Sequence, residues 1–219
     1  MHNTSDRPLE ADDTGTITVY SDYVCPFCYL GRQSLETYQS DREEPLRIDW
    51  RPFDLRAGKR APDGSIDHDA DDGKGESYYE RAKENVSRLR EEYGADEMEL
   101  DLATEVDSLP AQLVSVAVRE TYDYDTWRDF DEAVFAALWH EGRDIGDGDV
   151  LVDIATDAGV DPDDVRSALA DEARRAALDE QFRQAQSDGV TGVPTFVADG
   201  HAARGAVPPE QLERLVEGT

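Results

Sequence analysis

The sequence predicts an α/β fold that is interrupted by a helical insertion. Near the start of the chain, two stretches with strand character enclose one with helical character. Several helical patterns follow, and a short hairpin and a last helix end the chain. This order of elements is typical of a mixed fold in which a run of helices separates the strands of one domain.

The first strand–helix–strand unit lies between residues 16 and 53. Thr16–Tyr20 alternates and is rich in β-branched residues, which predicts a strand. A helix is expected from Pro26 to about Gln39, with the proline in the first turn, where no backbone donor is needed. Arg47–Phe53 alternates again and predicts a second strand, parallel to the first across the helix.

The middle of the chain reads as helical. Residues 57–75 contain Gly, Asp and Pro without periodicity and predict a mobile loop. Four helical patterns follow, over residues 78–93, 108–121, 127–138 and 161–186. We expect Ser108 to cap the second helix, and Asp161, followed by Pro162, to cap the fourth.

The end of the chain returns to strand character. Gly192–Ala198 is a short strand candidate, and Asp199-Gly200 is a hairpin signal before a partner strand at His201–Arg204. A final helix is expected over Pro208–Glu217.

The composition is strongly acidic. The 219 residues include 51 Asp and Glu against 22 Lys and Arg, so the net charge is −29. The acidic residues are spread along the whole chain, which resembles the composition of proteins from halophilic archaea and predicts adaptation to a high-salt cytoplasm. The alternative is an acidic protein that binds a basic partner. Nucleic-acid binding is not expected, because no basic stripe is present to neutralise phosphates.

Neither a membrane span nor a secretory leader is expected. No apolar run approaches the roughly 20 residues that a bilayer requires. The segment 1–14 is polar and acidic, lacks the apolar part of a signal peptide, and is predicted to be a disordered lead-in. We therefore expect the protein to be cytoplasmic.

The pair Cys25-Pro26-Phe27-Cys28 is the strongest chemical signal. Two residues between the thiols, on the opening turn of a helix, allow an intramolecular disulfide. The free N–H groups and positive dipole end of that helix favour thiolate, which is the attacking species. We expect Cys25 to be the better exposed thiol and the nucleophile, and Cys28 to be the resolving thiol.

Two other interpretations of the cysteines stay open. Half of a zinc site shows the same spacing, but four ligands are needed, and the sequence has no second cysteine pair and no histidines at ligand spacing. No metal is therefore expected. Two buried, inert cysteines also fit the count.

His140, which follows an apolar helical stripe, is interpreted as a surface or satisfied histidine with no partner nearby in the sequence.

A second element is Val193-Pro194, which follows Thr191-Gly192. A proline that opens a strand can take the cis peptide at modest cost. Alone, this string is also consistent with the start of an edge strand.

Together these motifs resemble the DsbA-like thioredoxin-fold oxidoreductases, and most closely the FrnE-like subgroup. The matching segments occur in family order and are Ser21–Gly31, Arg51–Phe53, Glu141–Ile145 and Gly189–Phe196. The resemblance implies a thioredoxin-like fold interrupted by a helical insertion domain. The implied domains are 15–56 with 188–219 for the thioredoxin-like part, and 57–187 for the insertion.

The resemblance also implies the composition of the site. Pro194 is expected to be cis and to face the cysteines, as the third catalytic residue beside Cys25 and Cys28. Substrate contacts are expected from Pro26 and Phe27 next to the thiols and from Thr191 and Val193 before the proline. The Pro-Phe dipeptide lacks the His of the family founder, so we expect Cys25 to be less acidic than in that protein.

The expected function is thiol–disulfide exchange between Cys25-Cys28 and a protein or a low-molecular-weight thiol, without a cofactor. Whether the protein is a monomer or a homodimer stays open. One alternative is an enzyme that resembles glutathione-S-transferase kappa or 2-hydroxychromene-2-carboxylate isomerase, although such relatives typically have Ser where Cys25 stands. The other is a non-catalytic binding or chaperone module, in which Cys25 is inert.

Overall fold

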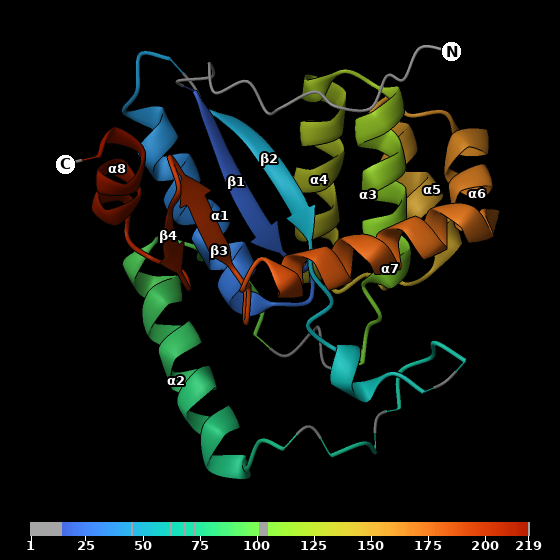
Figure 1. Ribbon diagram of the computed structural model, residues 1–219, viewed down its shortest axis with the longest axis horizontal. Coiled ribbons are helices and arrows are strands. Elements are labelled where there is room, and N and C mark those ends of the chain that lie inside the picture. The colour runs from blue at the N-terminus through green and yellow to red at the C-terminus, as the bar shows by residue number, and fades with distance from the viewer. Residues whose placement is uncertain are drawn as a thin grey trace.

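A computed structural model describes residues 15–44, 46–61, 63–67, 69–71, 73–100 and 105–218. The predicted lead-in, residues 1–14, lies outside the described residues. The strands named below form one sheet in the order β2-β1-β3-β4, and Figure 1 shows how the helices surround it.

The predicted strand–helix–strand unit is confirmed. Strand β1 (Thr16–Ser21) leads into helix α1 (Pro26–Ser40), and β2 (Arg47–Pro52) pairs with β1 in parallel. The register places Ile17 opposite Ile48. Pro26 is the first helical residue, where its missing N–H leaves no bond unmade.

The end of the sheet comes from the end of the chain. Strand β3 (Thr195–Ala198) pairs antiparallel with both β1 and β4 (His201–Arg204), and helix α8 (Pro209–Glu217) follows. The hairpin turn has positive φ at both central residues, 47° at Asp199 and 76° at Gly200, as a tight two-residue turn requires.

Among the described residues, the elements between β2 and β3 are helices. They are η1 (Ala57–Lys59), α2 (Glu76–Glu92), α3 (Leu109–Thr121), α4 (Tyr124–Trp139), α5 (Gly148–Asp157), α6 (Pro162–Ala170) and α7 (Glu172–Ser187). In the region 57–75, predicted as a loop, the described residues contain only η1 and one bridge between Arg60 and Ile66.

Three expectations about the helices were wrong. The stretch 161–186 is two helices, because Asp171 has extended backbone and its side chain accepts the N–H groups of Ala173 and Arg174, which starts α7 anew. Helix α5 was not expected, and Asp147 caps it by accepting the Asp149 N–H. Ser108 stands at the N-cap position of α3, but its backbone is helical and its side chain accepts no N–H of that helix.

The sheet and the helices share one apolar core. Fully buried side chains of the sheet and α1, such as Ile17 and Leu30, belong to the same cluster as Trp127 and Phe130 of α4. Helices α1 and α8 pack together, and α7 contacts β2. Helices α3 to α6 gather beside the sheet and α2 extends away from it (Figure 1). The division into 15–56 with 188–219 and 57–187 remains a prediction.

Candidate active site

The two cysteines lie at the start of α1. Cys25 occupies the N-cap position with extended backbone, φ −89° and ψ 115°, and its side chain caps no N–H. Its carbonyl accepts the N–H of Cys28 at 2.9 Å and that of Tyr29 at 3.3 Å. The first helical turn therefore brings the two side chains to the same end of the helix, where unpaired N–H groups favour negative charge.

Both cysteines are free thiols, and Cys25 is near enough to Cys28 to raise the pKa of its thiol. Each residue is only 3% exposed. The expectation that Cys25 is the more exposed of the two is wrong, because a segment near the end of the chain covers it. The Cys25 sulfur donates to the carbonyl oxygen of Val193 at 3.6 Å.

The surroundings of the Cys28 thiol strongly oppose its ionisation. Burial raises its pKa well above the ordinary value, and the hydrogen bond and negative charge of Cys25 act in the same direction. The Ser21 hydroxyl and the Asp22 N–H contact the Cys28 sulfur and oppose this shift only in part. Cys28 therefore holds its proton at neutral pH and can donate it in a hydrogen bond to the sulfur of Cys25.

The Val193–Pro194 peptide is cis, as expected. Pro194 packs closely on the second turn of α1: a Cβ on Gly31 would lie 3.0 Å from the proline Cγ and 3.1 Å from the Phe196 ring. Gly31 is therefore the residue of α1 that permits this approach. The expectation that Pro194 faces the two cysteines stays a prediction.

The predicted substrate residues divide into two groups. Pro26 and Phe27 are half-buried beside the thiols, and Val193 is half-buried and touches Cys25 through its carbonyl. Thr191 is exposed, and among the contacts of the described residues none joins it to a sulfur. The structure therefore brings together all the predicted site residues except Thr191.

Asp22, which the sequence analysis did not single out, is completely buried before the cysteines. Its carboxylate accepts the Val24 N–H at 3.3 Å and the Leu55 N–H at 2.8 Å. Burial raises the pKa of Asp22 to about 6, and the charge of Asp54 adds to the rise while the hydrogen bonds oppose it.

Tyr23 fixes the same loop to helix α4. Its hydroxyl donates to Asp131 at 2.7 Å, and its carbonyl accepts the Trp139 indole N–H at 2.9 Å. Asp131 is wholly buried and also forms an ion pair with Arg32 of α1. The loop that leads into the cysteines is thereby held from the helical side of the molecule.

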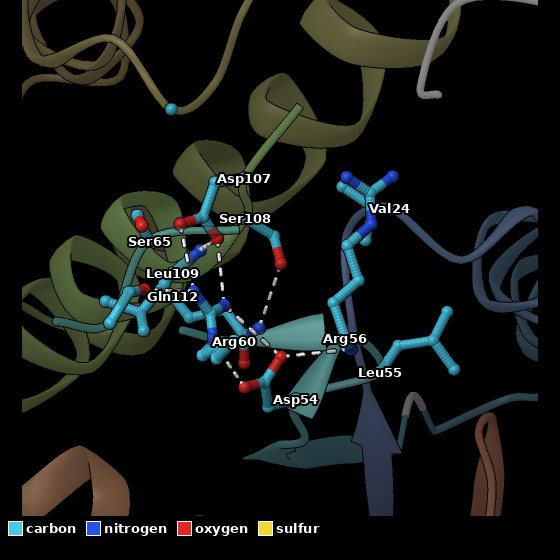
Figure 2. A network of polar contacts seen from close by, with 12 residues as sticks. Val24, Asp54, Leu55, Arg56, Arg60, Ser65, Asp107, Ser108, Leu109 and Gln112 are labelled. Carbon is cyan, nitrogen blue, oxygen red and sulfur yellow. Dashed lines mark hydrogen bonds and ion pairs between the residues drawn. The ribbon is translucent and has the colours of Figure 1, made fainter. Parts of the chain in front are cut away.

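A charged cluster ties the segment after β2 to the segment before α3. Figure 2 shows the Arg60 guanidinium between Asp54 and Asp107. Arg60 Nε lies 2.5 Å from Asp54 Oδ2, and Nη2 lies 2.9 Å from Asp107 Oδ1. Asp107 also accepts the N–H of Leu109 at 3.0 Å, so the same carboxylate fixes the first turn of α3.

A profile described as a DSBA-like thioredoxin domain matches residues 16–217.

The chain belongs to that family.

The family match contains both cysteines and the cis proline. A relative from Bacillus subtilis, named uncharacterized protein YwbO, is 26% identical over 204 residues, which are 91% of this chain and 94% of that protein. Two solved structures share the fold. The probable DsbA oxidoreductase SCO1869 from Streptomyces coelicolor has a TM-score of 0.70 and 23% identity, and the match covers 93% of this chain and 90% of that one. A 2-hydroxychromene-2-carboxylate isomerase has a TM-score of 0.68 and 20% identity, over 93% of each chain.

The interpretation of His140 as a surface or satisfied histidine is confirmed. The residue is half-buried, and its Nε2 lies 2.7 Å from the hydroxyl oxygen of Tyr29, the residue after Cys28. Burial raises the pKa of Tyr29 to about 12, and the charges of Glu36 and Glu97 act in the same direction. Sequence spacing did not reveal this pair, because the two residues are 111 positions apart.

Within the described part of the chain, no group of three or more His, Cys, Asp or Glu residues could hold a metal ion. No helix among the described residues is long and apolar enough to cross a membrane.

Proposed function

We propose that this member of the DSBA-like family is a thiol–disulfide oxidoreductase in which Cys25 is the nucleophile and Cys28 the resolving thiol. The observation that supports it is the pair of free thiols at a helix start, with Cys25 in contact with the Val193 carbonyl that precedes the cis proline. Its substrates are protein or low-molecular-weight disulfides and thiols.

The exchange takes two steps in the reducing direction. The Cys25 thiolate attacks one sulfur of the substrate disulfide, the substrate S–S bond breaks, and the leaving thiolate takes up a proton. Cys28 then loses its proton and attacks the Cys25 sulfur, so that the Cys25–Cys28 bond forms and the mixed disulfide breaks. The second substrate sulfur leaves as a thiolate and is protonated. Two electrons pass from the dithiol to the substrate, and the same steps in reverse oxidise a substrate dithiol.

The role of each cysteine follows from its surroundings. The raised pKa of Cys28 keeps it protonated until the mixed disulfide forms, so it does not compete as first nucleophile. Cys25 lies at the N-cap, where the helix dipole stabilises a thiolate.

The substrate approaches past the residues that cover Cys25. Phe27 and Pro26 supply an apolar side to the entrance, and the Val193 carbonyl, which Cys25 contacts in the free protein, is an acceptor for a substrate N–H. Thr191 lies exposed two residues before Val193 and is the outermost member of this surface.

The proposal also includes the subgroup of the family and the adaptation to a high-salt cytoplasm. The four matching segments support the FrnE-like subgroup. The charge of −29 with only three lysines supports a protein adapted to a high-salt cytoplasm.

The test is an exchange assay with three proteins: the unsubstituted chain, Cys25→Ser and Cys28→Ser. The unsubstituted chain should reduce insulin with a dithiol donor or oxidise a dithiol peptide. Cys25→Ser should lose both activities, and Cys28→Ser should accumulate a mixed disulfide at Cys25, visible by mass spectrometry. Full activity of Cys25→Ser would contradict the proposal. Rapid alkylation of one thiol before the other at neutral pH argues against an inert binding or chaperone module.

A second candidate is an isomerase that acts on aromatic substrates with glutathione. The fold match to the 2-hydroxychromene-2-carboxylate isomerase over 93% of each chain favours it. The presence of both cysteines disfavours it. Turnover of the isomerase substrate that persists in Cys28→Ser, together with no disulfide exchange by the unsubstituted chain, would select this candidate.

A further inference from the structure

Strand β4 forms one edge of the sheet, and its outer side is open. The sheet order places β2 and β4 at the two edges. Within β4, His201, Ala202 and Arg204 are exposed, and Ala203 is buried. An exposed edge strand presents backbone N–H and C=O groups to which another strand can bind.

The register of the β3–β4 hairpin identifies these groups. Ala198 and His201 flank the two-residue turn and form a hydrogen-bonded pair. Bonded and non-bonded pairs alternate along an antiparallel ladder, so Ala203 lies in the next bonded pair. The N–H and C=O groups of Ala202 and Arg204 therefore point away from β3. Among the described residues, no group outside the sheet is hydrogen-bonded to them.

The opposite edge of the sheet is closed by side chains of the helical insertion. The Tyr124 hydroxyl accepts the N–H of Ile48 at 2.8 Å, and the Arg119 guanidinium donates to the carbonyl oxygen of Trp50. Helices α3 and α4, which carry these two side chains, lie on the β2 side of the sheet (Figure 1). In the part of the chain that the structure describes, β4 is therefore the edge that stays open.

The charge around β4 differs from that of the rest of the chain. Residues 189–209 contain a single acidic residue, Asp199, whereas the whole chain has 51 in 219 residues. Strand β4 itself has no acidic residue and carries Arg204. Two copies with a net charge of −29 repel each other through most of their surfaces. The β4 edge is a place where they can meet without bringing carboxylates together.

A two-fold axis at Ala203 makes this edge complementary to itself. Antiparallel pairing about that axis places Ala202 of one copy opposite Arg204 of the second copy, and the reverse. Each such pair exchanges two N–H···O bonds, so every outward group of both residues gains a partner. The small Ala202 side chain leaves room for the long arginine beside it. A register shifted by two residues would instead set Arg204 against itself, and like charges directly opposite are destabilising.

We propose that β4 is a dimerisation edge, through which two copies of this chain join antiparallel into one continuous sheet. The inference does not depend on the proposed function. Because β4 has four residues, the interface is small and the dimer is a weak one. Salt should favour it, since about 1 M salt shortens the range of the charge repulsion to about 3 Å.

The first experiment compares Ala202→Pro and its matched control Ala202→Ser with the unsubstituted chain. Sedimentation velocity is measured in about 1 M KCl, where charges are screened, with excess dithiothreitol to prevent disulfides between copies. Proline removes the outward N–H, which the monomer does not use, so the fold should persist, and the Tm of dilute protein checks this. We expect the dimer of Ala202→Pro to be at least about tenfold weaker, because each copy loses one hydrogen bond. Ala202→Ser keeps the N–H and should associate like the unsubstituted chain.

The second experiment needs no variant. Hydrogen exchange at the amides of Ala202 and Arg204 should slow as the protein concentration rises, whereas the Ala203 amide, which bonds within the hairpin, should not respond. An unsubstituted chain that stays monomeric up to about 1 mM, a range that includes weak contacts, overturns the inference. Equal association of Ala202→Pro and the unsubstituted chain, or a dimer that leaves both outward amides unprotected, also overturns it, since the copies then meet elsewhere.

Discussion

The Tyr23 hydroxyl donates to the Asp131 carboxylate at 2.7 Å, and this bond joins the loop before the cysteines to helix α4. Asp131 has a second partner in Arg32, which lies on the helix after the cysteines. One buried carboxylate therefore anchors the chain on both sides of the cysteine pair.

Breaking the Arg32–Asp131 pair should be strongly destabilising. Arg32 is 9% exposed and Asp131 is not exposed, so Arg32→Met leaves a buried charge without its counterion. We expect a loss of about 3–5 kcal/mol in the free energy of unfolding, measured by urea denaturation. The double variant Arg32→Met, Asp131→Leu should recover part of that loss. The exposed pair Arg88–Glu92 is the control, and its removal should change stability by about 1 kcal/mol or less. A loss in Arg32→Met as small as the control would show that the buried pair is not an anchor.

A side chain at Gly31 should disturb the site and the fold together. In Gly31→Ala the new Cβ meets Pro194 at 3.0 Å and Phe196 at 3.1 Å, so the proline segment must shift away from α1. We expect a loss of about 1–3 kcal/mol in unfolding free energy, as for other overpacked positions, and slower disulfide exchange. Gly58→Ala is the control, because nothing lies within 4 Å of its Cβ. Stability and exchange rates equal in the two variants would contradict the close packing of Pro194 on α1.

Asp22 should make the protein less stable as the pH rises from about 4 to 6. Its pKa is about 6 in the folded protein against 3.8 as the ordinary value, so the folded state binds this proton more tightly. The stabilising contribution is complete below the lower value and is lost as the pH passes the higher one. Relative to Asp22→Asn, which does not ionise, the natural chain should lose about 3 kcal/mol across this window. Urea unfolding at a series of pH values measures the difference.

Asp63 supplies a control of opposite sign for that measurement. The Ser65 hydroxyl and N–H hold the pKa of Asp63 below its usual range. The natural chain should therefore gain stability relative to Asp63→Asn as the pH rises to about 4, a window that lies below that of Asp22. A stability difference for Asp22→Asn that does not change with pH would mean that Asp22 titrates normally.

Salt should stabilise the protein. The net charge of −29 repels itself over about 10 Å at 0.1 M salt but only about 3 Å at 1 M, so Tm should rise with KCl concentration. A groove of about 530 Å³ between the end of α1 and α8 concentrates this repulsion, since its lining includes Glu43, Glu44, Glu210 and Glu213. The double variant Glu210→Gln, Glu213→Gln should show a smaller rise. A Tm that falls with KCl would contradict the salt-adaptation hypothesis.

The sequence was most informative where periodicity or a local motif determined the structure. The alternating strands β1 and β2, the helix that begins at Pro26 and the Asp199-Gly200 turn all follow from neighbouring residues. The break at Asp171 was missed, because an apolar pattern on both sides of a capping residue resembles one continuous helix.

The residues that support the site could not be predicted from local sequence patterns. Asp22 and Ser108 are ordinary polar residues in the sequence, and only the fold buries them. The same holds for the burial of Cys25, since its cover comes from a segment that no spacing rule connects to it. The cysteine pair and Pro194 were predicted because both lie in segments that resemble the family's motifs.

The contact between Cys25 and Val193 also has a consequence for the order in which the molecule matures. The two residues are 168 positions apart, and strand β3, which follows Val193, lies in the sheet directly beside β1. During synthesis the thiols leave the ribosome long before the segment that shields them, so the nascent chain carries both thiols unshielded. The finished cysteine site is among the last features that translation completes.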